Sequence, residues 1–165
     1  MSWVIRDEEK LRDLPLESRL QRCEDILKHD KDQSKRWDAV WLVGEIAREA
    51  GKGPLFDKAA ELLAWDLAND NDGVVKHEVC YQISACDMRD KIPDMVEAGL
   101  RNESALARHE AIECLGSMEA FEVKENLKEG LKDPIPYVRE TAAFAIKRLE
   151  RMERRKGQYN LSEIL

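Results

Sequence analysis

A helical pattern that recurs four times along the chain constrains its fold more than any other feature. The four segments begin at residues 35, 75, 107 and 138. Each has a basic residue, a small or branched residue three places later and an apolar residue four places after that. This spacing is typical of a helix face that packs into a core. Successive segments are offset by 40, 32 and 31 residues, which is the range of helical solenoids. The recurrent basic residues are Arg36, Lys76, Arg108 and Arg139.

Partner helices and polar turns fill the intervals between these segments. Turns rich in Asn, Asp, Ser, Gly and Pro separate the apolar stripes that predict helices over residues 16–28, 54–68, 91–100 and 121–131. We therefore predict a single all-α domain over residues 1–165. It is expected to be an α-solenoid of about four helix pairs, at roughly 14–50, 51–88, 89–118 and 119–153, followed by a loose tail over 157–165.

Charge and composition exclude several classes of function. The formal net charge of −7 argues against nonspecific binding to nucleic acid, which requires clustered cations. The sequence has no apolar run of membrane-spanning length and no signal-peptide pattern at its start, so we expect a cytoplasmic protein with no membrane partner. The cysteines form no C-x-x-C pair, which predicts small buried side chains in a reducing compartment. They are Cys23, Cys80, Cys86 and Cys114.

Two His-Glu pairs occupy equivalent positions of the repeat. His77-Glu78 and His109-Glu110 lie 32 residues apart, and stacked repeats place equivalent residues side by side on one surface. Two imidazoles and two carboxylates that converge there suit a divalent transition metal, iron in particular. The third histidine, His29, lies near a helix end, where we expect a favourable interaction with the helix C-terminus.

The basic residue near the start of each second helix, with an A-x-x-A-L-G-like pattern after it, resembles the HEAT repeats. In that family the second helix of each pair lines the concave face. The resemblance implies that the position after the basic residue faces inward in every repeat. That position is occupied in turn by Trp37, His77, His109 and Glu140.

One helical turn further along, the same face is occupied by Trp41, Tyr81, Glu113 and Phe144. Glu113 lies four residues after His109 and is expected to accept a hydrogen bond from that imidazole, and Tyr81 has the same relation to His77. Core packing is favoured for Trp41 and Phe144, and the alternative for Trp41 is to line the wall of a groove together with Trp37. The candidates for holding a metal-binding side chain in place, or for lining the wall of a substrate groove, are therefore Trp37, Tyr81, Glu113 and Glu140.

The helices that carry His77 and His109 are expected to be neighbours, with axes roughly 8–10 Å apart, so that both imidazoles reach one ion. Glu110 is turned by about 100° around its helix from His109 and can bend onto the same ion. Two histidines and one carboxylate form the facial set of non-haem Fe(II) oxygenases, which leaves positions open for dioxygen or substrate. Glu78 is expected to ligate, to accept a proton, or to hold a cationic group of the substrate.

The segments Lys76–Tyr81 and Arg108–Gly116 resemble the paired HE motifs of the deoxyhypusine hydroxylases. Members of that family are HEAT-repeat di-iron oxygenases with two halves of four repeats. They hydroxylate the deoxyhypusine side chain of a translation-factor precursor. This chain resembles one half, and Glu78 matches the glutamate near the substrate amine. The iron ligands that the resemblance implies are His77, His109 and Glu110.

A single chain would supply ligands for only one iron. The resemblance therefore implies a homodimer, because a two-fold axis duplicates every residue and would complete a di-iron centre between the subunits. The implied partner is a protein substrate with a cationic side chain.

Two other classes of function stay open. One chain could hold a mononuclear Fe(II) site with a storage or sensing role. Alternatively, the repeats could form a metal-free scaffold that binds a protein in its groove. The fold alone favours the scaffold, and only the paired His-Glu motifs oppose it.

Overall fold

The computed structural model describes the backbone of residues 10–162 and the side chains of residues 10–156. Regular structure in this range is helical throughout, which confirms the all-α prediction. The chain divides into two compact units, one up to Cys86 and the other from Asp87 onward. Each unit contains two of the helix pairs that the repeat pattern predicts.

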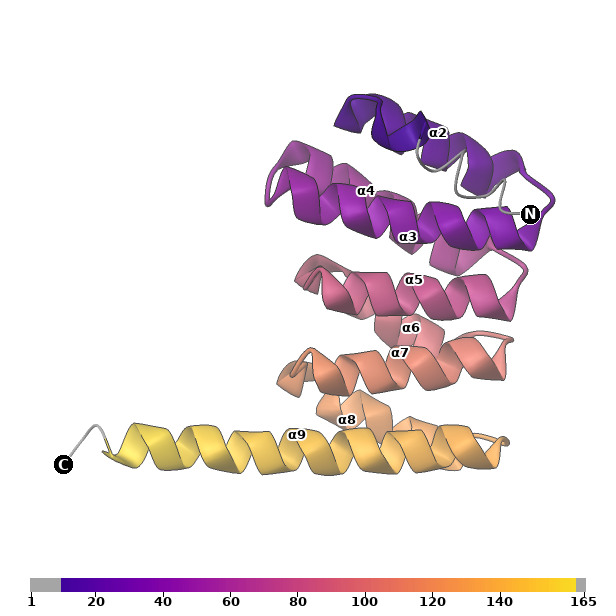
Figure 1. Ribbon diagram of the computed structural model, residues 1–165. Helices are drawn as coiled ribbons and strands as arrows, with labels where there is room; N and C mark the ends of the chain where they lie inside the picture. The colour runs from indigo at the N-terminus through magenta and orange to yellow at the C-terminus, as the bar shows by residue number, and fades with distance from the viewer. Residues whose placement is uncertain (1–9, 163–165) are drawn as a thin grey trace. The chain divides into compact units, whose positions relative to one another are not determined.

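The first unit consists of helices α2 (Leu16–His29), α3 (Gln33–Ala50), α4 (Pro54–Asn69) and α5 (Gly73–Ala85). Helix α3 packs against the other three, and Figure 1 shows α5 lying beside it. Aspartate side chains cap the second helix of each pair. Asp32 accepts a hydrogen bond from the backbone of Ser34 at the start of α3, and Asp72 accepts from the backbone of Val74 and Val75 at the start of α5. The largest fully buried side chains of this unit are Val40, Val43, Ile46, Leu63, Gln82 and Ile83.

The second unit contains α6 (Ile92–Arg101), α7 (Ala105–Ser117), the short α8 (Lys124–Leu127) and the long α9 (Pro136–Ser162). Three 3₁₀ turns connect them: η1 (Arg89–Lys91), η2 (Phe121–Val123) and η3 (Lys128–Lys132). Ser104 caps α7 by accepting a hydrogen bond from the backbone of Ala107. Helix α7 packs against α6 and α9, and Figure 1 shows that α9 extends well beyond α7.

The partner helix predicted over residues 121–131 is broken in the structure into η2, α8 and η3. Gly130 in η3 marks where this segment approaches its neighbours closely. A Cβ atom at Gly130 would lie 3.0 Å from the Ala142 side chain and 3.2 Å from that of Ile112. The backbone of η3 therefore comes as near to α7 and α9 as a residue without a side chain permits.

The recurrent basic residue of the second helices ties neighbouring turns together. Arg36 on α3 donates two hydrogen bonds to the Asp70 carboxylate, at 2.6 and 3.2 Å, and one to the backbone oxygen of Asp30. In the second unit, Arg108 makes the same fork to Asp133, at 2.6 and 3.0 Å. These side chains are almost entirely buried. The Arg108 guanidinium lowers the pKa of Asp133 below its usual value.

Core packing was the wrong prediction for two aromatic residues. Trp41 is 37% exposed and Phe144 is 61% exposed. The buried stripe of each helix passes through the residue next to them, Val40 on α3 and Ala145 on α9. A neighbouring residue is turned by about 100° around the helix, so both aromatic rings lie off the core-facing stripe.

The end of α9 also differs from the predicted loose tail. The helix continues to Ser162, so residues 157–162 are helical; residues 163–165 of the predicted tail lie outside the described part of the chain. The four cysteines are all buried and none is in a disulfide, as predicted. Of the helices in residues 10–162, none combines the length and apolar character needed to cross a membrane.

Candidate metal centre

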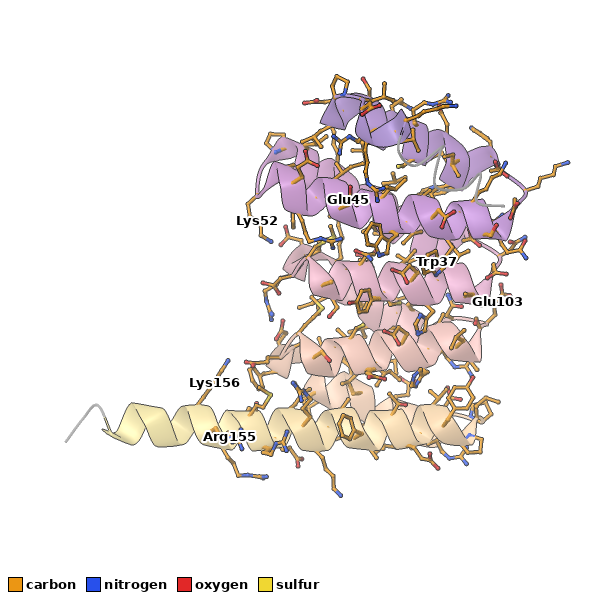
Figure 2. The ribbon with its side chains drawn as sticks, viewed as in Figure 1. Trp37, Glu45, Lys52, Glu103, Arg155 and Lys156 are labelled. Carbon is orange, nitrogen blue, oxygen red and sulfur yellow. The ribbon has the colours of Figure 1, made fainter. Side chains whose placement is uncertain are left out.

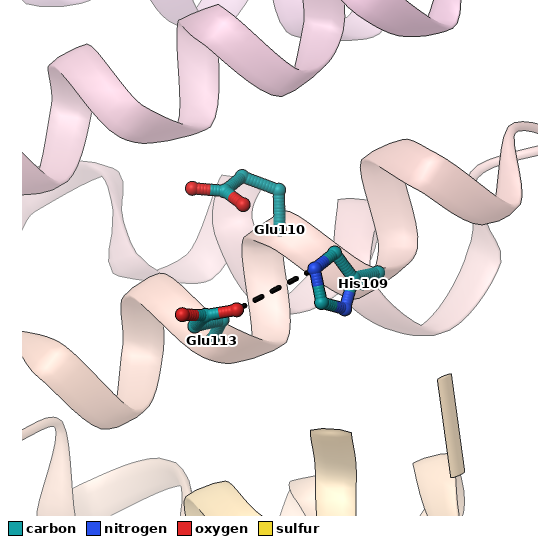
Figure 3. Close-up of side chains that lie close together, drawn as sticks. All are labelled: His109, Glu110 and Glu113. Atoms are coloured by element: carbon teal, nitrogen blue, oxygen red, sulfur yellow. Dashed lines mark ion pairs between the residues drawn. The ribbon is translucent and has the colours of Figure 1, made fainter. Parts of the chain in front are cut away.

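Three side chains of α7 bring together atoms of the kind that bind metal ions. His109, Glu110 and Glu113 each offer one such atom, and these atoms lie within 4.8 Å of one another. Glu113 follows His109 by one helical turn, which places both on one face. Figure 3 shows the contact between the imidazole and the Glu113 carboxylate, with Glu110 beside it. The cluster therefore arises from one helix.

Contacts on several sides hold the His109 ring. Its Nδ1 lies 2.7 Å from the hydroxyl oxygen of Thr141 on α9. The Tyr137 ring packs edge-on against the imidazole, with centroids 5.7 Å apart. Its Nε2 lies 3.4 Å from a carboxylate oxygen of Glu113. The ring is thus oriented by α9 before any ligand arrives.

The two carboxylates of the cluster differ in their surroundings. Glu110 is buried, with 8% of its surface exposed, and its Oε1 accepts a weak hydrogen bond from the Cys114 thiol at 3.4 Å. The Glu113 side chain is 49% exposed. One carboxylate is thus set into the protein and the other is open to solvent, so a metal ion could enter from the Glu113 side.

The His-Glu pair of the first unit lies on α5. His77 is half-buried, and Glu78 is buried at 8% exposure. The Glu78 Oε1 accepts a hydrogen bond of 2.8 Å from the amide of Gln82. The Gln82 oxygen in turn accepts one of 2.9 Å from Arg48 on α3. Arg48 thus reaches Glu78 through Gln82, whereas Glu110 accepts directly from Cys114.

Gly44 on α3 makes room for this chain of contacts. A Cβ atom at Gly44 would lie 1.9 Å from the Gln82 Oε1 and 2.6 Å from its Cδ. Because Gln82 is only 1% exposed, its amide has little space to retreat. The absence of a side chain at Gly44 is therefore part of what positions Glu78.

The residues predicted for the groove lie on the surfaces of four helices, with Glu113 on α7 as described above. Trp37 projects from α3 and is 36% exposed (Figure 2), and Tyr81 on α5 is 51% exposed. Glu140 is exposed on α9. His77 belongs to the first unit and His109 to the second. Their convergence on one ion, and a groove shared by these side chains, stay predictions.

The donor set of α7 fits Fe(II), since imidazole nitrogen and carboxylate oxygen are both ligands that this ion accepts. The cluster has one imidazole and two carboxylates. The set predicted from the sequence has two imidazoles and one carboxylate. Either set leaves coordination positions that protein atoms do not fill. His109 and Glu110 are common to both.

Sequence reasoning missed three residues that hold these side chains in place. Gln82 lies four residues after Glu78, a spacing that brings side chains together on a helix. Thr141 follows Glu140, the position that is equivalent to His109 in the next repeat, so the repeat register alone pointed to its neighbour rather than to Thr141. Gly44 gave no comparable signal, because only the packing of α3 on α5 shows why it must be glycine.

Comparisons with known proteins place these features in a family context. The sequence profile of the HEAT repeats matches residues 60–147. The deoxyhypusine hydroxylase of Saccharomyces cerevisiae is 32% identical over 139 residues, which cover 81% of this chain and 43% of the yeast protein. That of Aspergillus clavatus is 30% identical over 154 residues, which cover 90% of this chain and 45% of the fungal protein.

A solved structure shows the same likeness in three dimensions. Human deoxyhypusine hydroxylase in complex with glycerol superposes with a TM-score of 0.71 at 25% sequence identity, over 86% of this chain and 46% of the human chain. The chain thus spans less than half the length of these relatives.

Proposed function

The chain belongs to the HEAT-repeat family and resembles one half of a deoxyhypusine hydroxylase, and from this premise we propose that it is a non-haem iron-dependent hydroxylase. The observation that carries the proposal is the α7 cluster, in which His109, buried Glu110 and Glu113 gather within 4.8 Å. A scaffold that bound only protein would not require an oriented imidazole beside a buried carboxylate.

His109 and Glu110 on α7 would bind the iron, and we propose His77 on α5 as the further ligand that the repeat register implies. Iron bound there would supply the activation of dioxygen. The residues of the chain have other tasks. Burial of Glu110 keeps one carboxylate oriented. The half-exposed Glu113 faces the proposed metal position from the solvent side, from which a substrate can approach.

Glu78 is proposed to orient an amine-bearing substrate. A carboxylate is the natural partner for a cationic group, and the Gln82 amide holds one of its oxygens in place. Trp37 and Tyr81, which are exposed on α3 and α5, would provide aromatic walls for the aliphatic part of such a side chain. The proposed substrate is a protein carrying deoxyhypusine or a chemically similar extended amine.

We propose that two chains form the active unit as a homodimer. The relatives are about twice as long as this chain, and a two-fold axis would supply the second half by duplicating every residue.

We also propose that the protein is cytoplasmic. Buried cysteines outside any disulfide suit a reducing compartment, and the four are Cys23, Cys80, Cys86 and Cys114.

A mononuclear iron site is the second candidate. The α7 cluster lies on a single helix of one unit, so it needs no second chain. This site would bind one iron per monomer and would suit a sensing or storage role.

Iron binding tests the proposal. Wild type, His109→Ala, Glu110→Gln and His29→Ala are loaded with Fe(II) under anaerobic conditions and desalted, and iron per chain is measured. Wild type is expected to retain about one iron per chain, and the first two variants to lose most of it. His29 lies at the end of α2, outside both pairs, so its variant is the matched control and should bind as wild type does.

Turnover is tested with a deoxyhypusine-containing protein, dioxygen and a reductant, by the gain of one oxygen atom in the mass spectrum. Iron content in wild type no higher than in a His77→Ala/His109→Ala variant would contradict the proposed metal site. Iron without turnover on any amine-bearing protein would favour the sensing or storage role.

A further inference from the structure

Thr141 on α9 contacts two groups with a single hydroxyl. Its oxygen lies 2.8 Å from the backbone oxygen of Tyr137 and 2.7 Å from His109 Nδ1. The hydroxyl has one hydrogen to donate and lone pairs to accept with. Only one of the two contacts can therefore be a donation by Thr141, and the choice determines which nitrogen of His109 carries a hydrogen.

Donation to the Tyr137 carbonyl satisfies both short contacts. Thr141 then bonds one turn back along its own helix, as Thr hydroxyls commonly do, and His109 Nδ1–H donates to the hydroxyl oxygen. Donation to His109 instead would leave two oxygen atoms 2.8 Å apart with no hydrogen between them. In return, that alternative would allow a hydrogen bond from Nε2–H to Glu113, but this contact is longer, at 3.4 Å, and therefore weaker than the one it replaces.

We infer that Thr141 is a positioning residue for the candidate metal centre, and that it holds His109 with the hydrogen on Nδ1. Nε2 then presents its lone pair toward the Glu113 carboxylate. Two electron-rich atoms facing each other at that distance are stabilised by a cation between them. The inference rests on the proposed function in assigning that place to a metal ion.

This arrangement gives α9 a part in the site that the His-Glu motif does not contain. A metal-bound histidine needs its other ring nitrogen bonded to an acceptor, which sets the tautomer and the ring orientation. Thr141 supplies that acceptor from the next helix, and the Tyr137 ring supports the imidazole from its edge. Thr141 is the only threonine in the chain.

The tautomer can be measured directly on metal-free protein. Wild type, Thr141→Ser and Thr141→Val are labelled with ¹⁵N, and the imidazole nitrogens are observed through their two-bond couplings to the ring protons at a pH where histidine is neutral. His109 signals are assigned with His29→Ala and His77→Ala. Wild type and Thr141→Ser should show hydrogen on Nδ1. Thr141→Val, which has similar size but no acceptor, should shift His109 toward the Nε2–H form that free imidazole side chains favour.

Fe(II) affinity, measured anaerobically by competition with a chromogenic chelator, provides the second readout. Thr141→Val should bind about 10-fold more weakly or worse, whereas Thr141→Ser should stay close to wild type. An Nε2–H tautomer in wild type would overturn the inference, as would a Thr141→Val variant with unchanged tautomer and affinity. If Thr141→Val does not fold, wild type and Thr141→Ser still decide the tautomer. Absence of iron in wild type would refute the proposed function and leave the tautomer result standing.

Discussion

Single residues of this protein show where burial conflicts with charge. Asp66 on α4 is completely buried, and neither of its carboxylate oxygens has a hydrogen-bond partner within the part of the chain that the structure describes. Burial, with a smaller contribution from the neighbouring charge of Asp70, raises its pKa to about 7, even though Arg36 and Lys76 oppose the shift. Asp66 is therefore a site where the fold prefers a neutral side chain.

Asp66→Asn should make the protein more resistant to unfolding in neutral and alkaline solution than wild type. In the unfolded chain this carboxyl loses its proton near pH 4, whereas in the folded chain it keeps it up to about pH 7. Wild-type stability thus falls as the pH rises from 4 to 7, by at most about 4 kcal/mol, and the asparagine variant escapes that fall. Urea unfolding at pH 5 and pH 8 measures the effect.

Asp57→Asn is the control for this prediction, since Asp57 lies exposed in the first turn of the same helix. Its stability relative to wild type should change little between the two pH values. An Asp66→Asn variant whose advantage does not grow with pH would show that the buried carboxyl is not the source of the dependence.

Pairs of elements are held in register by contacts that cross from one helix to the next. On α3 and α5, Gly44 leaves the space that Gln82 occupies, and Gln82 in turn holds Glu78. Arg36 and Arg108 each donate to an aspartate in a turn between helices. Arg36 reaches Asp70, which lies before α5, and Arg108 reaches Asp133, which lies before α9. These contacts connect the core to the side chains of the candidate site.

Gly44→Ala should destabilise the protein by about 1–3 kcal/mol, because the new methyl group would occupy the place of the Gln82 amide. It should also disturb any substrate contact of Glu78. Chemical unfolding of Gly44→Ala, Gln82→Ala and the double variant measures the coupling. The double variant should be less destabilised than the two single changes added together, since the shorter side chain removes the clash. Strict additivity would contradict the proposed packing.

Asp133→Asn should cost about 2–3 kcal/mol near neutral pH, because it leaves the buried Arg108 guanidinium without its opposite charge. Arg108 lowers the pKa of Asp133, so this stability is present above the pKa of the unfolded carboxyl. It is lost as the pH falls through the lower pKa of the folded state. The difference between variant and wild type should therefore shrink in acid.

Glu125→Gln removes a comparable ion pair that is exposed, with Lys128. Its effect on unfolding should be at most about 0.5 kcal/mol. A loss as large as that of Asp133→Asn would show that the burial of the Arg108 pair does not matter.

For the molecule as a whole, the chain has the ligands of one proposed iron and is about half as long as its relatives. If two copies complete the centre, metal binding and association are linked, because each stabilises the other. Sedimentation of wild type should then show more dimer with Fe(II) than with a chelator. His109→Ala should not respond to iron, whereas His29→Ala should. A wild-type monomer that binds iron without associating would select the mononuclear site.

The fold was largely predictable because each repeat carries its own local sequence pattern. The apolar stripes and the polar turns depend on residues within one or two helical turns, so helices around Arg36, His77 and His109 were predicted close to their observed positions. The exposure of Trp41 and Phe144 was not predictable in this way. Which flank of a stripe meets solvent depends on the neighbouring helices that cover it.

The candidate site divides along the same line. Residue type and spacing along one helix suffice to predict the helical repeat and the chemistry of the two His-Glu pairs. The burial of Glu78 and Glu110, the fit of Gln82 against Gly44 and the contact of Thr141 with His109 follow from the packing of one helix on another. Burial and the state of an imidazole nitrogen depend on atoms of a second helix, and no pattern within one helix specifies where those atoms lie.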